Sequence, residues 1–303
     1  MSVVLNALRL SLIGLIAFAL CGRASGIEGA IPSVYVTNYP LKYFAERIAG
    51  VHAKVVFPAP KDVDPAFWMP DLEAIQGYQQ AELILLNGAG YEKWIDQVSL
   101  PQLKLVNTSS EFRSQYIKLA EAFSHTHGPG VEHTHGETAP TTWLDFRLAE
   151  RQAEAVAEAL RRVHPQRAQS LAKNYGALKR DLAALDRQMK EIVAHHPQKP
   201  LLASHPVYQY LARGYGLNLR SLHWEPDALP SAEQWAELKR LLQEHPANWL
   251  LWEKRPLAHT VTQLQGLGVS SLVFDPCANV PEQGDFLSLM RQNLENLKPA
   301  FED

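Results

Sequence analysis

Residues 168–194 read AQSLAKNYGALKRDLAALDRQMKEIVA, a stretch without proline in which large apolar residues recur at helical spacing. These residues are Leu171, Leu178, Leu182, Leu185 and Met189. At about 1.5 Å per residue, a helix over the whole stretch would be roughly 40 Å long. Short β-branched runs lie on both sides of the helical segment at residues 147–196. The long helix is therefore predicted to be a rigid connector between two α/β halves.

The half before the connector alternates strands with helices. Apolar runs occur at residues 33–37 (SVYVT), 53–57 (AKVVF) and 82–87 (ELILLN), and a helical pattern runs from Leu41 to Ile48. Strands that alternate with helices indicate βαβ units and a parallel sheet. We therefore expect an N-terminal α/β lobe over residues 27–146.

The half after the connector repeats this alternation and is expected to form a C-terminal α/β lobe over residues 197–303. Strands are predicted at 200–203, 217–222, 248–252 and 269–274, and helices from about 207, at 231–243 and at 284–297. The predicted fold class is α/β, with two parallel-sheet lobes joined by one long connector helix.

The composition excludes some classes of protein and disfavours others. The 303 residues are 46% hydrophobic and carry 29 Lys+Arg against 32 Asp+Glu, a net charge of −3. The apolar content excludes a disordered or fibrous chain. Because a nucleic-acid binder usually carries a basic excess, nucleic acid is disfavoured as a partner.

Residues 1–26 have the pattern of a secretory signal peptide, with Arg9 followed by the apolar run LSLIGLIAFAL and then by small residues. The run is shorter than the roughly 20 apolar residues that span a bilayer. Lipidation of Cys21 is disfavoured, because the preceding Leu20 is too bulky. We expect a mature monomer that is exported to the periplasm and is not inserted in the membrane.

Residues 124–140 (SHTHGPGVEHTHGETAP) are poor in apolar residues and are predicted to form a mobile surface loop. Four of the twelve histidines lie in it, namely His125, His127, His133 and His135. Imidazole is a preferred ligand of zinc, copper and nickel, so the segment is predicted to be an auxiliary metal-capture loop. A solvated linker with accidental histidines and a pH-sensing patch are the alternatives.

Several segments together resemble one family. They are residues 57–70 (FPAPKDVDPAFWMP), 82–95 (ELILLNGAGYEKWI), 140–145 (PTTWLD), 204–217 (SHPVYQYLARGYGL) and 273–276 (VFDP). Their order and motifs resemble the zinc/manganese-type (cluster A-I) periplasmic solute-binding proteins of metal ABC importers, whose zinc-importing members carry a histidine-rich loop. The resemblance implies a metal-binding cleft between the two lobes, and an ABC permease as partner.

The resemblance also implies ligand positions, with two histidines from the first lobe and one histidine and one carboxylate from the second. His205 and Asp275 match the second-lobe pair. The first-lobe positions hold Ala66 and Thr141 in place of histidine. Because zinc prefers four donors in a tetrahedron, His205 and Asp275 would leave half of its coordination sphere unfilled.

Three completions of this half site are open. A histidine of the loop could swing into the cleft. Second-lobe groups could add donors, either Glu253 or the pair His223 and Glu225. The cleft could instead hold a larger guest between aromatic walls; the tryptophans in cleft-lining segments are Trp68, Trp143, Trp224 and Trp252.

The sequence therefore predicts a periplasmic solute-binding protein that captures a divalent transition metal and delivers it to an ABC permease. Zn²⁺ is the first candidate, with Mn²⁺ or another divalent metal as alternatives. The other functions considered are the same fold binding a metal chelate or small organic ligand, and a non-transport surface interaction protein. No enzyme is expected, since no Gly-rich phosphate loop, Ser-His-Asp order, Cys-x-x-Cys pair or His-Glu-x-x-His spacing occurs.

Four further residues are expected to have no functional role. Cys277 is predicted to be a small buried residue, and His164, His245 and His259 are predicted to lie at the surface.

Overall fold

A computed structural model describes residues 31–119, 124–126, 132–134 and 138–302. The predicted signal peptide with Cys21, and the loop residues His127 and His135, lie outside these ranges. Within them, each helix is either too short or too polar to cross a bilayer.

The first lobe holds a four-stranded parallel sheet. Its strands are β1 (Ser33–Val36), β2 (Lys54–Val56), β3 (Leu83–Leu86) and β4 (Leu105–Asn107), in the order β2-β1-β3-β4. Helix α1 (Tyr39–Ala49) connects β1 to β2, and α2 (Leu72–Gln80) lies between β2 and β3. Asn38 starts α1 by accepting a hydrogen bond from the Leu41 amide, as an N-cap does.

The second lobe repeats the parallel arrangement. Its strands are β7 (Pro200–Ala203), β8 (Asn218–Ser221), β9 (Trp249–Trp252) and β10 (Ser270–Val273), in the order β10-β9-β7-β8. Its helices are α5 (Gln209–Tyr215), α6 (Ala232–Glu244), α7 (Ala258–Gly266) and α8 (Phe286–Leu297). The two parallel-sheet lobes confirm the predicted fold class.

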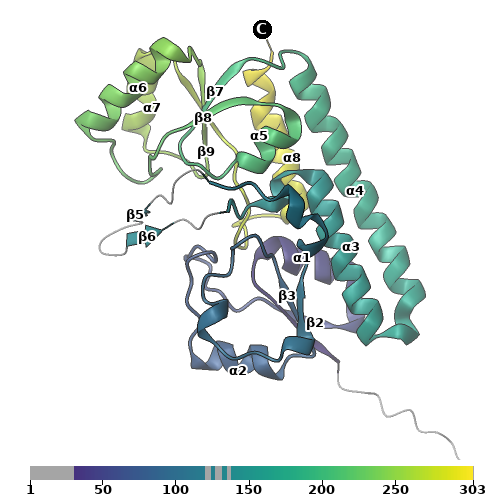
Figure 1. Cartoon of the computed structure of the whole chain (residues 1–303). Coiled ribbons are helices and arrows are strands. Elements are labelled where there is room, and N and C mark those ends of the chain that lie inside the picture. The colour runs from purple at the N-terminus through teal and green to yellow at the C-terminus, as the bar shows by residue number, and fades with distance from the viewer. Residues whose placement is uncertain (1–30, 120–123, 127–131, 135–137, 303) are drawn as a thin grey trace, which may run out of the picture. The chain divides into compact units, whose positions relative to one another are not determined.

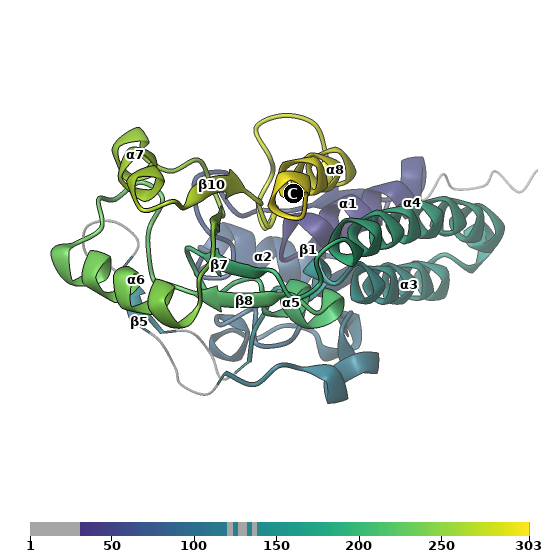
Figure 2. The same ribbon diagram turned by 90° about the horizontal axis from the view of Figure 1, so that it is seen from above.

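The connector is present as predicted. Helix α3 (Phe146–Val163) is followed by α4 (Ala168–Ala194), which has the predicted bounds. Helix α4 packs against α3 and α1 on one side and against α5 and α8 of the second lobe. Figures 1 and 2 show α3 and α4 side by side, with α8 beside α4.

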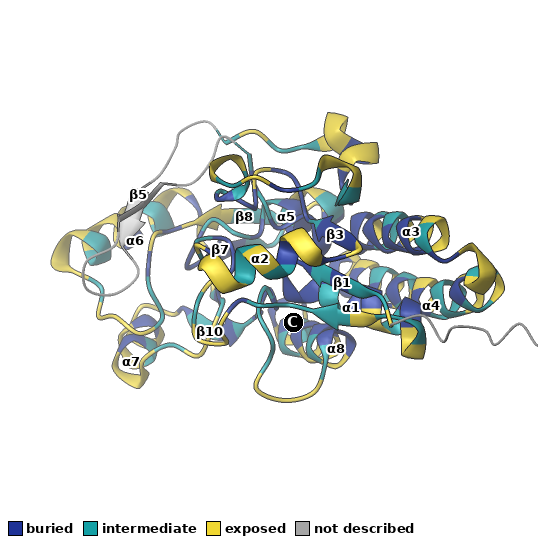
Figure 3. Ribbon diagram, turned by 90° about the horizontal axis from the view of Figure 1, so that it is seen from below, coloured by how far each residue is buried: buried dark blue, intermediate teal, exposed yellow. Residues whose placement is uncertain are grey.

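One hydrophobic core runs through both lobes. It includes Val34 and Leu85 of the first sheet, Leu182 of α4, and Leu201 and Leu251 of the second sheet. Figure 3 shows the buried side of α3 and α4 as a stripe along each helix, whereas α6 and α7 are mostly exposed. A smaller core beneath α6 contains Trp224 and Trp252.

The histidine-rich segment contains regular structure that the loop prediction did not include. Strands β5 (Ser124–Thr126) and β6 (Glu132–Thr134) pair antiparallel, with His125 opposite His133. This corrects the prediction of a plain loop, because short Thr-containing runs on either side of a Gly-Pro-Gly segment favour a hairpin.

The prediction for the outlying histidines is wrong at two positions. His164 and His245 are only 8% and 5% exposed. His245 follows α6 and turns inward, where its Nε2 lies 3.0 Å from the Leu201 carbonyl of β7. His259 is exposed and Cys277 is buried, as predicted.

The remaining short elements are 3₁₀ turns. They are η1 (Gly50–His52), η2 (Ile95–Gln97), η3 (Gln102–Lys104), η4 (Ser110–Gln115), η5 (Thr142–Leu144), η6 (Pro165–Arg167) and η7 (Lys298–Ala300). Turn η5 contains Trp143 and leads directly into α3.

Candidate metal centre

The two first-lobe segments that carry ligands in the resembling family lie against the second lobe. The Thr141 hydroxyl donates a hydrogen bond to the Val207 carbonyl at 2.5 Å, and Trp143 Nε1 donates to the Pro276 carbonyl at 2.7 Å. Val207 is two residues after His205, and Pro276 follows Asp275. The segment around Thr141 therefore contacts both second-lobe segments that carry candidate ligands.

The segment around Ala66 is held in a similar way. Asn279 Nδ2 donates to the carbonyls of Pro60 and Val63, at 2.6 and 2.7 Å. The Ala66 side chain belongs to the continuous core, and its amide donates to Asp64 Oδ1 at 2.9 Å. Ala66 and Thr141 thus lie at the junction of the lobes, but neither offers an imidazole to an ion.

His205 is 2% exposed and follows β7 by two residues. Its Nδ1 lies 3.3 Å from the Trp224 carbonyl. Because a carbonyl can only accept, this hydrogen bond places a proton on Nδ1, and a neutral ring with that proton carries its lone pair on Nε2. A histidine held in this way has the tautomer that metal-binding histidines commonly show.

Three side chains of the second lobe surround His205. Its Nε2 lies 3.8 Å from Glu225 Oε1, and its Nδ1 lies 3.9 Å from Glu253 Oε1. The ring centroids of His205 and His223 are 6.1 Å apart. The structure thus brings together His205 with the groups that the second predicted completion names.

Asp275 follows β10 and is partly buried. Its Oδ1 accepts a hydrogen bond from the Cys277 amide at 2.7 Å, and its backbone N–H donates to Asn293. Burial raises the pKa of the Asp275 carboxyl, and the hydrogen bond from the Cys277 amide partly opposes that effect. Burial also raises the pKa of the neighbouring Cys277 thiol, which disfavours the thiolate form that binds metals.

The described side chains do not yet form a closed metal site. Among the residues that the structure describes, no three His, Cys, Asp or Glu side chains are positioned to hold an ion together. Of the four loop histidines, His125 and His133 stand opposite each other on β5 and β6, and His127 and His135 fall outside the described ranges.

The expectation of aromatic walls is wrong for three of the four tryptophans. Trp143, Trp224 and Trp252 are at most 1% exposed. Trp224 packs against Trp252 and Trp235, at ring-centroid distances of 6.2 and 4.8 Å. These rings form the hydrophobic cores instead of lining a ligand cleft, and Trp68 packs at the edge of a first-lobe cluster.

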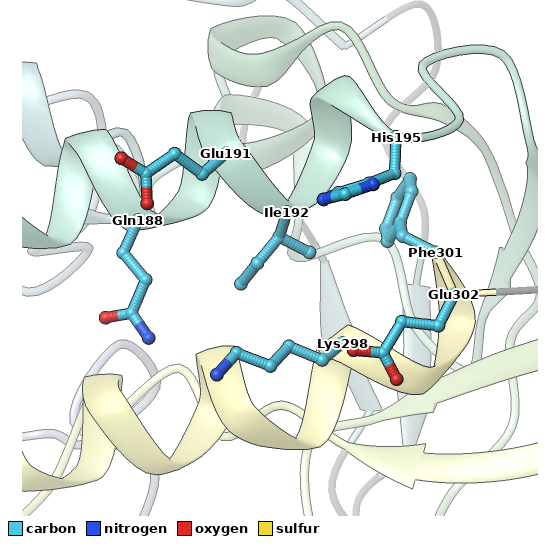
Figure 4. Close-up of a pocket in the computed structure, with 7 residues that line it drawn as sticks. All are labelled: Gln188, Glu191, Ile192, His195, Lys298, Phe301 and Glu302. Carbon is cyan, nitrogen blue, oxygen red and sulfur yellow. The ribbon is translucent and has the colours of Figure 1, made fainter.

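Two cavities in the described part of the chain lie away from His205 and Asp275. One, of about 490 Å³, lies between the end of α4 and the C-terminal segment, and Figure 4 shows Ile192, His195 and Phe301 among its lining residues. Another, of about 390 Å³, lies beside Gly88 at the end of β3. Neither is lined by His205 or Asp275.

Sequence reasoning missed a buried polar network at the end of β3. The carboxylate of Glu92 accepts hydrogen bonds from the Thr37 hydroxyl and the Asn87 amide, both at 2.6 Å, and from the Gly88 amide at 3.1 Å. Burial raises the pKa of Glu92. Gly88 has φ of 75°, and a Cβ there would stand 2.2 Å from Asn107 Oδ1. The NGAGYE stretch was the available signal, because its glycines permit the left-handed turn that places Glu92 over the strand end.

The chain is similar in sequence to a known zinc-binding protein. The chain is 26% identical over 289 residues to the zinc-binding lipoprotein AdcA of Streptococcus pneumoniae, a match that covers 92% of this chain and 57% of that protein. The chain therefore matches little more than half the length of this curated relative.

Two solved structures share the fold. The zinc-bound ZnuA-like domain of Streptococcus pneumoniae AdcA superposes with a TM-score of 0.77 at 23% identity, over 90% of this chain and 100% of that domain. The metal-dependent lipoprotein YcdH of Bacillus subtilis gives a TM-score of 0.76 at 22% identity, over 88% and 98%. Finally, a family model described as "Zinc-uptake complex component A periplasmic" matches residues 34–300. Because this match covers most of the chain, the protein belongs to the family of periplasmic zinc-uptake component A.

Proposed function

We propose that this protein is an exported solute-binding protein that captures a divalent transition metal, with zinc as its main cargo, and delivers it to an ABC permease. Family membership over residues 34–300 supports the transport role, and the name of the streptococcal relative supports zinc. The observation that carries the proposal is His205, a buried imidazole at the carboxyl end of β7 with its Nε2 directed toward Glu225.

The chemistry of the donors is suited to zinc. A neutral imidazole and carboxylates are ligands that zinc accepts. We assign His205 to the metal site, with Glu253 beside it, and Asp275 at the second family position is a further candidate donor that its own variant tests. The loop histidines would collect the ion first and pass it on by ligand exchange.

The export route and the oligomeric state are parts of the same proposal. Residues 1–26 would act as the signal peptide, and the mature lobes would span residues 27–146 and 197–303 on either side of the helical segment. The protein would act as a monomer in the periplasm. The family is one of transport components, and we assign the chain no catalytic step.

Zinc titration of the metal-free protein against a competing chelator tests this function. We expect a dissociation constant below micromolar, and a marked loss of affinity in His205→Ala. His259→Ala, which removes an exposed imidazole from α7, is the matched control and should bind zinc as the unaltered protein does. Binding weaker than micromolar that does not change in His205→Ala would refute the cleft site.

A further inference from the structure

The carboxyl edge of the second sheet places the candidate donors in a definite order. The strand order β10-β9-β7-β8 puts Asp275, Glu253, His205 and then His223 and Glu225 along that edge. Neighbouring strands lie about 4.8 Å apart. Asp275 therefore follows a strand two spacings from that of His205, whereas His223 and Glu225 follow the adjacent strand.

The distances on the β8 side are close to those of a metal site. Donor atoms on one tetrahedral zinc, each about 2.0–2.2 Å from the ion, lie about 3.4 Å from one another. Glu225 Oε1 lies 3.8 Å from His205 Nε2, so a small side-chain movement would let both contact one ion. Two imidazoles on one zinc have ring centroids about 5 Å apart. The His205 and His223 rings are 6.1 Å apart and inclined at 80°.

The required movement falls on side chains that solvent reaches. His223 is exposed, and the Glu225 side chain is 20% exposed. His205 is fixed by contrast, because its Nδ1 faces the Trp224 carbonyl and, at 3.9 Å, a carboxylate oxygen of Glu253. Partners of this kind orient a ligand imidazole and raise its basicity.

The first lobe contributes contacts in place of donors. The hydroxyl of Thr141 donates to the Val207 carbonyl, and Trp143 donates to the Pro276 carbonyl. These hydrogen bonds join the lobes directly.

We propose that the metal site of this chain is built on the second lobe alone, with His205 Nε2, His223 and Glu225 as ligands and Glu253 as the residue that positions His205. The proposal rests on the proposed function, since it names the ligands for the same cargo. It leaves the fourth position of a tetrahedral zinc open to water or to an exchanging ligand.

Chelator competition with Zn²⁺ on the full chain separates this site from the family positions. Loss of an outer partner alone costs about 10–100-fold in metal affinity, so His223→Ala and Glu225→Gln should each weaken zinc binding at least about 100-fold. Asp275→Asn and the control His259→Ala should change it less than about threefold. Each variant is also measured with the four loop histidines replaced by serine, so that loop binding does not hide the effect. Circular dichroism confirms that each variant is folded.

The outcomes distinguish the two proposals. If the unaltered protein binds zinc tightly and Asp275→Asn abolishes binding while His223→Ala and Glu225→Gln do not, the second-lobe site is refuted and the proposed function stands. If the unaltered protein does not bind zinc, both proposals fall.

The absorption of Co²⁺ bound in place of zinc tests the positioning role of Glu253. Glu253→Gln should weaken binding about 10–100-fold and keep the visible band of the bound ion, because the ligands are unchanged. His223→Ala should alter that band, because one nitrogen donor is lost. Glu253→Asp should recover part of the affinity. A Glu253→Gln variant with an altered band would make Glu253 a ligand and overturn its assigned role.

Discussion

Thr141 is a residue whose role differs from that implied by the family pattern. It is 7% exposed, and its hydroxyl donates across the lobes to the Val207 carbonyl. Histidine at this position in the resembling proteins would contribute a metal donor, whereas threonine contributes a hydrogen bond between the lobes. The residue therefore connects the lobes through a direct hydrogen bond.

Thr141→Val should lower the free energy of unfolding by about 1 kcal/mol, because one partly buried hydrogen bond is lost at nearly constant volume. Zinc affinity should not change, because the proposed donors all lie on the second lobe. Urea denaturation and chelator competition measure the two quantities. Thr262→Val is the control, since the hydroxyl of Thr262 bonds only within exposed α7. A loss of zinc binding in Thr141→Val would show that this segment contributes to the site.

Glu92 is expected to make the free energy of unfolding depend on pH, and this can be measured without metal. Because burial raises its pKa in the folded state, the folded protein retains this proton at pH values where the unfolded chain has lost it. The contribution of Glu92 to stability should therefore fall as pH rises from about the ordinary glutamate value of 4.5 through the raised pKa. Urea denaturation of the protein and of Glu92→Gln across pH 4–8 should show a smaller decline in the variant. Equal slopes would contradict this assignment.

The sequence identified most of the residues around His205, and it failed where side-chain direction decides. His223, Glu225 and Glu253 could be named because each follows a predicted strand, and the ends of parallel strands meet at one edge of the sheet. Aromatic cleft walls stayed one of the open alternatives because a residue beside a strand end can point into the core or out of it. Periodicity over one or two residues does not distinguish these directions.

At the scale of elements, a helix could be predicted from the sequence where it buries a stripe of apolar residues. Helix α4 buries a full stripe of large apolar residues, and its bounds could be predicted. Helix α2 buries only Tyr78, and α7 buries only Thr260 and Leu264, so neither has an apolar stripe that predicts a helix. Strand β4 has three residues and none of them is fully buried, so its sequence is too short and too weakly patterned to predict a strand.

Gly176 is a weak point in the middle of α4. An added Cβ would meet only Arg180 Nη1, at 3.8 Å, so alanine fits there without strain. Glycine within a helix costs about 0.5–1 kcal/mol relative to alanine. Gly176→Ala should therefore raise the free energy of unfolding by about that amount, as measured by urea denaturation. The neighbouring Ala177→Gly is the reciprocal control and should lower it by a similar amount. A neutral or destabilising Gly176→Ala would mean that α4 needs the missing side chain for packing.

At the scale of the whole molecule, the largest hydrophobic core is shared by the two lobes. The chain length favours two domains, yet the buried cluster runs from β1 through α4 to α8 without a break. Sequence could not reveal this, because it depends on how the faces of α1, α4 and α8 meet across the lobes. Folding of one lobe is therefore expected to depend on the other.

Zinc binding should accordingly stabilise both lobes together. At a free zinc concentration about 100 times the dissociation constant, binding to the folded state adds about 2.7 kcal/mol to the free energy of unfolding. With a shared core, that gain should move a single unfolding transition to higher urea, with the same midpoint by tryptophan fluorescence and by circular dichroism. In His205→Ala the shift should disappear, while the transition without zinc stays single. Two separate transitions, of which zinc moves only one, would show that the lobes unfold independently and that the common core does not couple them.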